Sequence, residues 1–216
     1  MTQRYNSEDT INDILNAAAH LFIQKGYEKT SIQDIVNELD GLTRGAIYHH
    51  FNSKDEIVDA VVKRLVLNPK YIDVIIQRQD LNGLEKLQHL FLEGISNDES
   101  LTNFTASFPL LDNPKLFLMH VNNNNKILVP YVEQMIITGN QDGSINVPYP
   151  KQIAEVVILL LVTWYTHALF PTPTEEIWDK NEAAKYVLSS IGLDILSDDV
   201  MVEIKRKVAE AQKKPD

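Results

Sequence analysis

The segment from Thr43 to Phe51 combines side chains that suit contact with DNA bases and phosphates. Ile47 and Phe51 lie one helical turn apart and are expected to face a core. The remaining outward positions are Thr43, Arg44, Gly45, Ala46, Tyr48 and His49. Small residues let a helix backbone approach another surface closely, while the arginine fork suits guanine or phosphate. An ordinary crossing of small residues in a helical bundle fits the composition equally well, so composition alone leaves both interpretations open.

Motifs for catalysis, nucleotide cofactors and metals do not occur in the sequence. The eight glycines are isolated, so neither G-x-G-x-x-G nor a P-loop can be assembled, and G-x-S-x-G and H-E-x-x-H are missing. Without cysteine, thiolate metal sites and cysteine nucleophiles are excluded. We predict no catalytic residues, no cofactor and no metal site. An all-α enzyme and a helical adaptor without a DNA role remain the alternatives.

Capping residues predict four helices in about the first 68 residues. A stripe of apolar residues marks the first helix over 11–22, and Gly26 ends it. Ser31 and Thr43 can cap two short helices that run to about Leu39 and Phe51. The turn between them is Asp40-Gly41-Leu42, and Ser53 with Glu56 starts a fourth helix that ends at Asn68-Pro69. Residues 31–50 therefore form a helix-turn-helix unit.

The chain beyond Pro69 keeps helical spacing, interrupted by prolines and polar runs, and no stretch shows alternating strands. We predict an all-α protein with a helix-turn-helix domain over 8–68 and a second helical domain over 69–216. Residues 156–170 are apolar on almost every side, but they are too short to span a bilayer. We expect them to form one buried helix, either in a core or at a dimer interface.

Length and charge describe an ordinary globular protein. The 216 residues allow one large domain or two small ones. The N-terminal residues carry no apolar signal segment, which favours a cytoplasmic location and no membrane partner. The net charge of −10 argues against a positively charged coat for nonspecific DNA binding, although a small local DNA-reading surface remains compatible with it.

The run from Gly26 to Val58, GYEKTSIQDIVNELDGLTRGAIYHHFNSKDEIV, resembles the DNA-binding domain of the TetR family of transcriptional regulators. A glycine and aromatic after the first helix, T-S-I-x-D-I, G-x-I-Y-x-H-F and N-S-K-D-E occur in the family's order. The turn over residues 39–43 is one residue longer than the family's commonest pattern. Residues 69–216 resemble the family only in being helical.

The resemblance implies DNA contacts from the recognition helix, from the start of the second helix and from the start of the fourth. These residues are Thr30, Ser31, Thr43, Arg44, Gly45, Ala46, Tyr48, His49 and Lys54. It also implies a homodimer on a roughly palindromic double-stranded DNA operator, with recognition helices about 34–36 Å apart. Residues 151–170 and 175–191 would form the dimer interface, with Trp164 and Trp178 as candidate anchors.

The resemblance further implies a ligand-responsive repressor that a small-molecule effector releases from DNA. Aromatic, methionine and polar side chains of the second half are the candidate ligand residues, and their character favours an apolar or aromatic effector. These are Phe91, Phe104, Phe108, Met119, His120, Asn123, Tyr131, Met135, Tyr165 and His167.

The charge distribution predicts weak binding to DNA of arbitrary sequence. Residues 1–64 contain seven basic and ten acidic side chains, so even the DNA-binding half is acidic. A dimer of about −20 should repel the duplex except along a narrow strip around Arg44 and Lys54. Titration of random-sequence DNA at low salt should show little binding, and strong sequence-independent binding would contradict this expectation.

Overall fold

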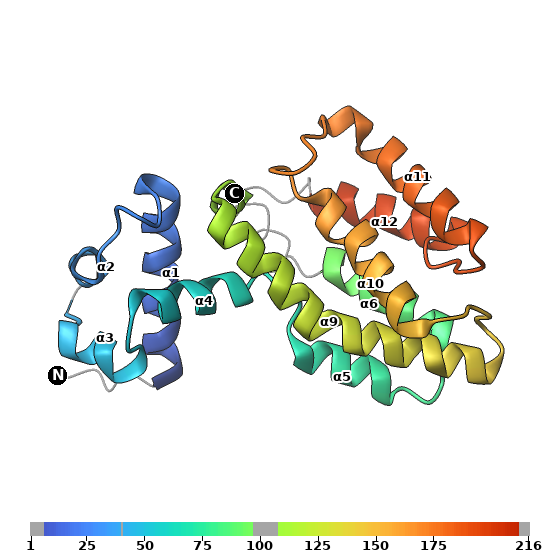
Figure 1. The fold of residues 1–216 in the computed structure, drawn as a ribbon, viewed down its shortest axis with the longest axis horizontal. Coiled ribbons are helices and arrows are strands. Elements are labelled where there is room, and N and C mark those ends of the chain that lie inside the picture. The colour runs from blue at the N-terminus through green and yellow to red at the C-terminus, as the bar shows by residue number, and fades with distance from the viewer. Residues whose placement is uncertain (1–6, 40, 97–107, 212–216) are drawn as a thin grey trace. The chain divides into compact units, whose positions relative to one another are not determined.

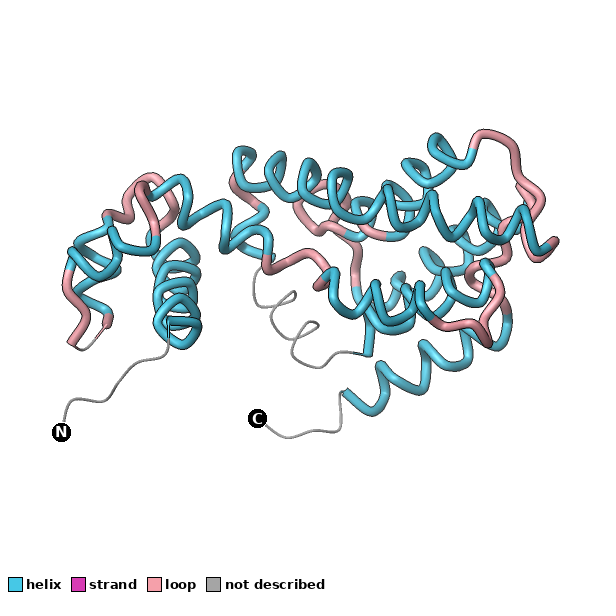
Figure 2. The backbone as a smooth tube through the Cα atoms, turned by 90° about the horizontal axis from the view of Figure 1, so that it is seen from below, coloured by secondary structure: helices cyan, strands magenta, loops and turns pink. Residues whose placement is uncertain are grey.

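The computed structural model describes residues 7–39, 41–96 and 108–211, which are helices joined by turns and loops (Figures 1 and 2). No strand occurs among them, and the all-α prediction is confirmed. Two compact units are present, one of residues 7–65 and 108–120, the other of residues 66–96 and 121–211. None of the helices in the described ranges is long and apolar enough to cross a membrane.

The first unit contains four helices from the N-terminal part of the chain and one short helix from its middle. They are α1 (Ser7–Lys25), α2 (Ile32–Glu38), α3 (Arg44–His50), α4 (Lys54–Lys63) and α8 (Phe108–Leu111). Helix α1 packs against α2, α4 and α8. The apolar stripe predicted for the first helix supplies the core, because Ile14, Ala18 and Phe22 are all buried.

The second unit contains longer helices. They are α5 (Pro69–Gln77), α6 (Gly83–Ser96), most of α9 (Pro114–Asp142), α10 (Pro150–Leu161), α11 (Ile177–Ser190) and α12 (Asp198–Ala211), with short 3₁₀ helices η1 (Thr163–Tyr165) and η2 (Thr174–Glu176). Its core draws on every one of the α-helices, with Leu87, Val132 and Ile158 among the fully buried side chains.

The boundary between the two units differs from a simple division at residue 68. Residues 108–120 belong to the first unit. The physical reason is burial, because Leu110 and Leu116 are 2% and 1% exposed within the core that α1 and α4 form. Burial of these two apolar side chains thus stabilises the packing of a segment from the middle of the chain in the N-terminal unit.

The expectation of one continuous helix over 156–170 is wrong, whereas its location in a core or at a dimer interface stays a prediction. Helix α10 ends at Leu161, and η1 follows with a change of direction in the backbone. The helix is also buried on one side only, since Val157 and Ile158 are inaccessible while Val156 and Leu159 are 44% and 49% exposed. An apolar run carries no periodicity signal that would show which of its faces is covered.

Helices α6 and α9 approach each other closely at a pair of glycines. A Cβ added to Gly83 would lie 2.2 Å from the backbone nitrogen of Gly139, which is far inside van der Waals contact. The backbone N–H of Gly83 also donates to Asp142 Oδ2 at 2.8 Å. Backbone meets backbone here, so no side-chain movement can make room for a methyl group.

Replacing Gly83 by alanine should therefore lower the free energy of unfolding by about 1–3 kcal/mol, because the helices must separate. The matched control is Gly94→Ala in the same helix, where an added Cβ meets nothing within 4 Å. That change should raise stability by up to about 1 kcal/mol, since alanine favours helix. Denaturant unfolding measures both, and equal effects of the two substitutions would refute the close crossing.

Candidate DNA-binding interface

The start of α2 is stabilised by its own first turn and by the end of α1. The Ser31 hydroxyl accepts from the backbone N–H of Asp34, and the Asp34 carboxylate accepts from the backbone N–H of Ser31 at 2.7 Å. Lys25 Nζ lies 2.8 Å from the same carboxylate. The ammonium of Lys25, followed by the hydrogen bonds from Ser31, holds the pKa of Asp34 well below its usual range. Ser31 and Asp34 thus form a reciprocal capping box, and the helix cap predicted at Ser31 is confirmed.

Helix α3 begins at its predicted cap. Thr43 Oγ1 accepts from the backbone N–H of Ala46 at 3.2 Å, and the turn before it includes Gly41 in the left-handed region at φ +82°. Ile47 is completely buried against α1, α2 and α4, while Phe51 is half-buried at the end of the helix. Burial of Ile47 determines which face of α3 is turned outward. Asp40, in the longer turn, lies outside the described residues.

The outward face of α3 carries the predicted DNA-reading residues. Arg44, Gly45, Tyr48 and His49 are exposed, and Ala46 is half-buried. Arg44 Nη2 donates to the Tyr48 hydroxyl at 3.3 Å, and the guanidinium carbon lies 5.5 Å from the centre of that ring. The pair is one turn apart, so Tyr48 orients the arginine along the helix.

Gly45 is not required by packing within the chain. A Cβ at this position would meet nothing closer than Thr43 Oγ1 at 3.8 Å, and the backbone φ is one that any residue adopts. A glycine in an exposed helix costs about 1 kcal/mol relative to alanine. The absence of a side chain here leaves the backbone open to close approach by an external surface.

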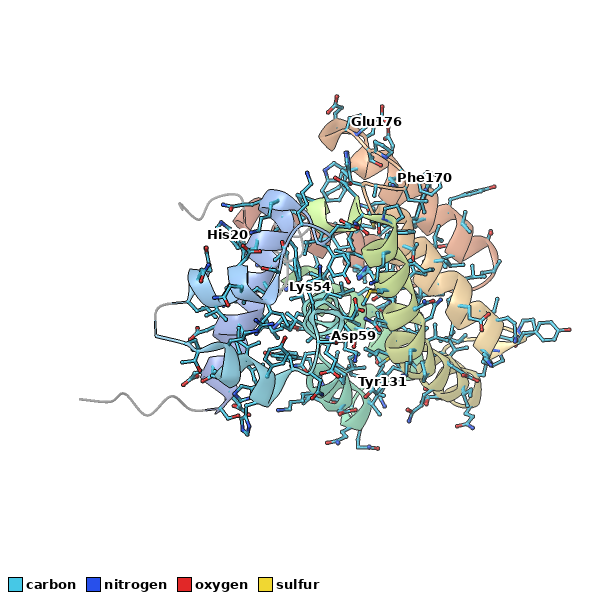
Figure 3. All side chains as sticks on the ribbon, turned by 60° about the vertical axis from the view of Figure 1, so that its left-hand side comes forward. His20, Lys54, Asp59, Tyr131, Phe170 and Glu176 are labelled. Carbon is cyan, nitrogen blue, oxygen red and sulfur yellow. The ribbon has the colours of Figure 1, made fainter. Side chains whose placement is uncertain are left out.

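Two of the side chains predicted to bind phosphate make hydrogen bonds inside the protein instead. Thr30 is 2% exposed, and its hydroxyl lies 2.9 Å from the carbonyl oxygen of Gly26 at the end of α1. Lys54, labelled in Figure 3, donates from Nζ to the carbonyl oxygens of Tyr27 and Thr30 at 2.9 and 3.0 Å. Both side chains hold the α1–α2 connection in place. Ser31, by contrast, is exposed at the start of α2.

Sequence reasoning missed a cluster formed by Tyr27, Lys54, Asp55 and Lys115. Lys54 and Lys115 place their ammonium nitrogens 4.2 and 4.5 Å from the centre of the Tyr27 ring. Lys115 Nζ also lies 2.8 Å from Asp55 Oδ1, and this carboxylate accepts from the Tyr27 hydroxyl. Hydrogen bonds from Lys115 and Tyr27 lower the pKa of Asp55. Lys115 is far away in sequence, and no local pattern indicates the contact.

The candidate ligand residues are distributed over both units. Phe108, Met119 and His120 belong to the first, whereas the other described candidates belong to the second. His120 is fully buried, which lowers its pKa to about 4 and keeps the ring neutral at pH 7. Met135 is a core residue and His167 is exposed. Phe104 and the side chain of Phe108 lie outside the described residues.

Three further candidates have defined surroundings in the second unit. Asn123 is buried, and the Tyr131 hydroxyl donates to Asp73 Oδ1 at 3.0 Å. The Tyr165 hydroxyl donates to Asn181 Oδ1 at 2.6 Å, and Phe91 packs half-buried against the core. A groove of about 590 Å³ between α9 and α10 is lined by other residues, Asn125, Lys126, Val129, Pro130, Glu133, Lys151, Glu155 and Leu159.

A capped helix-turn-helix whose second helix presents arginine, tyrosine and small residues defines a DNA-binding regulator. Residues 14–61 match the family described as bacterial regulatory proteins, tetR family. The TetC protein of transposon Tn10 from Escherichia coli is 28% identical over 200 residues, covering 82% of this chain and 88% of that protein. The transcriptional repressor KstR2 of Mycobacterium tuberculosis is 35% identical over 82 residues, covering 37% of this chain and 40% of KstR2.

Among solved structures, this chain is similar to NalD of Pseudomonas aeruginosa, the secondary repressor of a multidrug efflux pump. The two superpose with a TM-score of 0.62 at 23% identity, and the match covers 86% of this chain and 96% of NalD. The matched residues 14–61 place the helix-turn-helix of this chain in the TetR family of transcriptional regulators. Because these regulators are not enzymes, family membership removes the alternative of an all-α enzyme.

The placement of Thr30 yields a test that separates a folding role from a DNA contact. Thr30→Val removes the donor to the Gly26 carbonyl and should lower the free energy of unfolding by about 1–2 kcal/mol. Operator affinity of the folded protein should not change, because the hydroxyl is buried. Thr138→Val is the control, because the Thr138 hydroxyl donates to the carbonyl oxygen of Gln134 at an exposed position of α9. This substitution should lower the free energy of unfolding by no more than about 0.5 kcal/mol. If Thr30→Val lost operator affinity without any change in stability, Thr30 would have to be a phosphate contact after all.

Proposed function

We propose that the protein is a ligand-responsive repressor that binds a palindromic operator as a homodimer and leaves it when a small-molecule effector binds. The main observation in support of this proposal is the outward face of α3. Its orientation follows from the burial of Ile47, and its glycine has no role in packing within the chain. KstR2 and NalD, which share the helix-turn-helix or the fold, are both described as repressors.

In the proposed complex, α3 enters the major groove. Arg44 reads a base edge, most simply the O6 and N7 of guanine, and the Tyr48 hydroxyl binds a phosphate. Thr43, Gly45, Ala46 and His49 form the remaining contact surface. Ser31 binds phosphate at the start of α2, where backbone N–H groups attract anions. Lys54 reaches a phosphate by giving up its bonds to the Tyr27 and Thr30 carbonyls, whereas Thr30 supports this end of α2 from inside.

The proposed dimer interface lies on α10 and α11. Val156 and Leu159 on α10 are 44% and 49% exposed, and Tyr186 and Val187 on α11 are 77% and 43% exposed. Exposed apolar side chains on two helices that pack against each other form one surface that a second copy can cover. A twofold arrangement of such surfaces suits a palindromic operator. Trp164 and Trp178 are half-buried against the core of the second unit and remain the candidate anchors of this interface.

The effector would bind in the second unit and stabilise a dimer whose recognition helices no longer match the operator. This is a shift of population, so the effector must bind the released state more tightly. The predicted ligand residues remain the candidates for its site. A regulator of this kind acts in the cytoplasm, where the DNA is.

The operator can be selected from genomic DNA with the wild-type protein and then used to test Arg44. Arg44→Ala should weaken operator binding by about 1–3 kcal/mol, because a base contact is lost, while the dimer remains intact in sedimentation. The control is Lys63→Ala, which removes an exposed basic residue of α4 that pairs with Asp59 at 2.6 Å. That variant should bind as the wild type does. Normal affinity of the Arg44 variant would exclude Arg44 as a reader, and the absence of any selected operator would favour a helical adaptor.

A further inference from the structure

Lys180 on α11 is a buried lysine without a carboxylate partner in the described part of the chain. It is 7% exposed, and Nζ donates one hydrogen bond, to Thr172 Oγ1 at 2.8 Å. The Thr172 hydroxyl gives its own proton to the carbonyl oxygen of Phe170 at 2.9 Å. Thr172 is therefore a neutral acceptor that cannot balance the charge of the ammonium.

Three aromatic rings surround this ammonium. Nζ lies 5.0 Å from the ring centre of Trp164, 5.2 Å from that of Tyr165 and 5.7 Å from that of Phe170, which Figure 3 labels. The Tyr165 ring is held in position by its hydrogen bond to Asn181, the neighbour of Lys180. We name the five residues Trp164, Tyr165, Phe170, Thr172 and Lys180 the Lys180 box.

The rings offset only part of the cost of burying a cation. An ammonium has three N–H donors, and one of those of Lys180 is used in a hydrogen bond. Burial also lowers the pKa of Lys180, because the charged form is poorly solvated there. A buried cation with unused donors and no counter-charge is a site prepared for an anion.

The segment that supplies the rings contains a second, independent sign of an absent ligand. Thr163 and Thr166 are 5% and 0% exposed, and neither hydroxyl has a hydrogen-bond partner in the described structure. They flank Trp164 and Tyr165 at a spacing of three, which brings side chains to the same side of a 3₁₀ turn. Buried hydroxyls normally find partners, so such groups point to a polar molecule that binds beside them.

We propose that the Lys180 box binds the carboxylate of an amphipathic organic acid, and that this acid is the effector of the regulator. The inference rests on the proposed function and names the chemical class of its ligand. A single ammonium with the neutral Thr172 hydroxyl beside it matches a single negative charge. Aromatic walls match the apolar body that the candidate ligand residues already indicate.

A monoanion fits this site better than a phosphate ester. A phosphate carries nearly two charges and calls for several cations or backbone N–H groups. The start of α11 instead has exposed acidic side chains close in sequence, Glu175, Glu176, Asp179 and Glu182. Their field disfavours a dianion, while one carboxylate in contact with the Lys180 ammonium still gains a strong charge-assisted bond.

Calorimetric titration of the full-length protein with matched probes tests the proposal. The probes are octanoate and benzoate, each compared with its neutral amide, octanamide and benzamide. The carboxylates should bind at least about tenfold more tightly than the amides, because only they complement the ammonium. They should also weaken binding to the selected operator, whereas the amides should not.

Lys180→Met keeps the length of the side chain and removes its charge, so the preference for carboxylate over amide should disappear. Lys180→Gln provides a second variant if the methionine protein does not fold. The matched control is Lys185→Met on the same helix, because Lys185 is paired with Asp198. This control should keep the full preference for carboxylates.

Equal binding of acids and amides would overturn the inference, as would a preference for carboxylates that survives in Lys180→Met. The absence of any carboxylate binding up to about 10 mM would also overturn it. So would carboxylate binding that leaves the operator affinity unchanged. A dimer weakened about tenfold by Lys180→Met would also overturn it, because the counter-charge would then come from a second copy. The proposed function stands in each case if the wild-type protein still binds its operator, so the two failures are distinguishable.

Discussion

The burial of Ile47 is the interaction on which the DNA-binding surface depends. Helix α3 has seven residues, and a helix of this length is unstable alone in water. Its stability comes from the core of α1 and α4, into which Ile47 inserts completely, together with Ile35 of the equally short α2. Because one side chain anchors the helix, its rotation is determined, and Arg44 and Tyr48 must face outward.

Electrostatics then restrict what this surface can do. The chain is acidic, and one of its basic residues near α3, Lys54, binds carbonyl oxygens in the free protein. Arg44, which donates to the Tyr48 hydroxyl, therefore supplies the exposed positive charge on the outward face of α3. In the proposed complex, so little positive charge at the interface leaves the affinity to base contacts and shape, which favours specificity over general attraction to DNA.

Local chemistry made much of the N-terminal fold predictable. The caps at Ser31, Thr43 and Ser53 and the apolar stripe of α1 each depend on residues within a few positions of one another, and the structure contains all of them. Features that depend on distant partners were not predictable. Leu110 and Leu116 join the N-terminal core from the middle of the chain, and Gly83 meets Gly139. The inward turn of Thr30 and the rings around Lys180 likewise need the folded chain, because a threonine or lysine in sequence does not show its burial.

The most direct test of the account is hydroxyl-radical footprinting of the purified protein on fragments selected from genomic DNA. Binding as a symmetric dimer predicts protection related by twofold symmetry, centred on two major-groove faces about one helical turn or a whole multiple of it apart. The protected sequences should form an inverted repeat. Protection without symmetry, or no protected sequence at all, would contradict the claim that α3 reads DNA as part of a symmetric dimer.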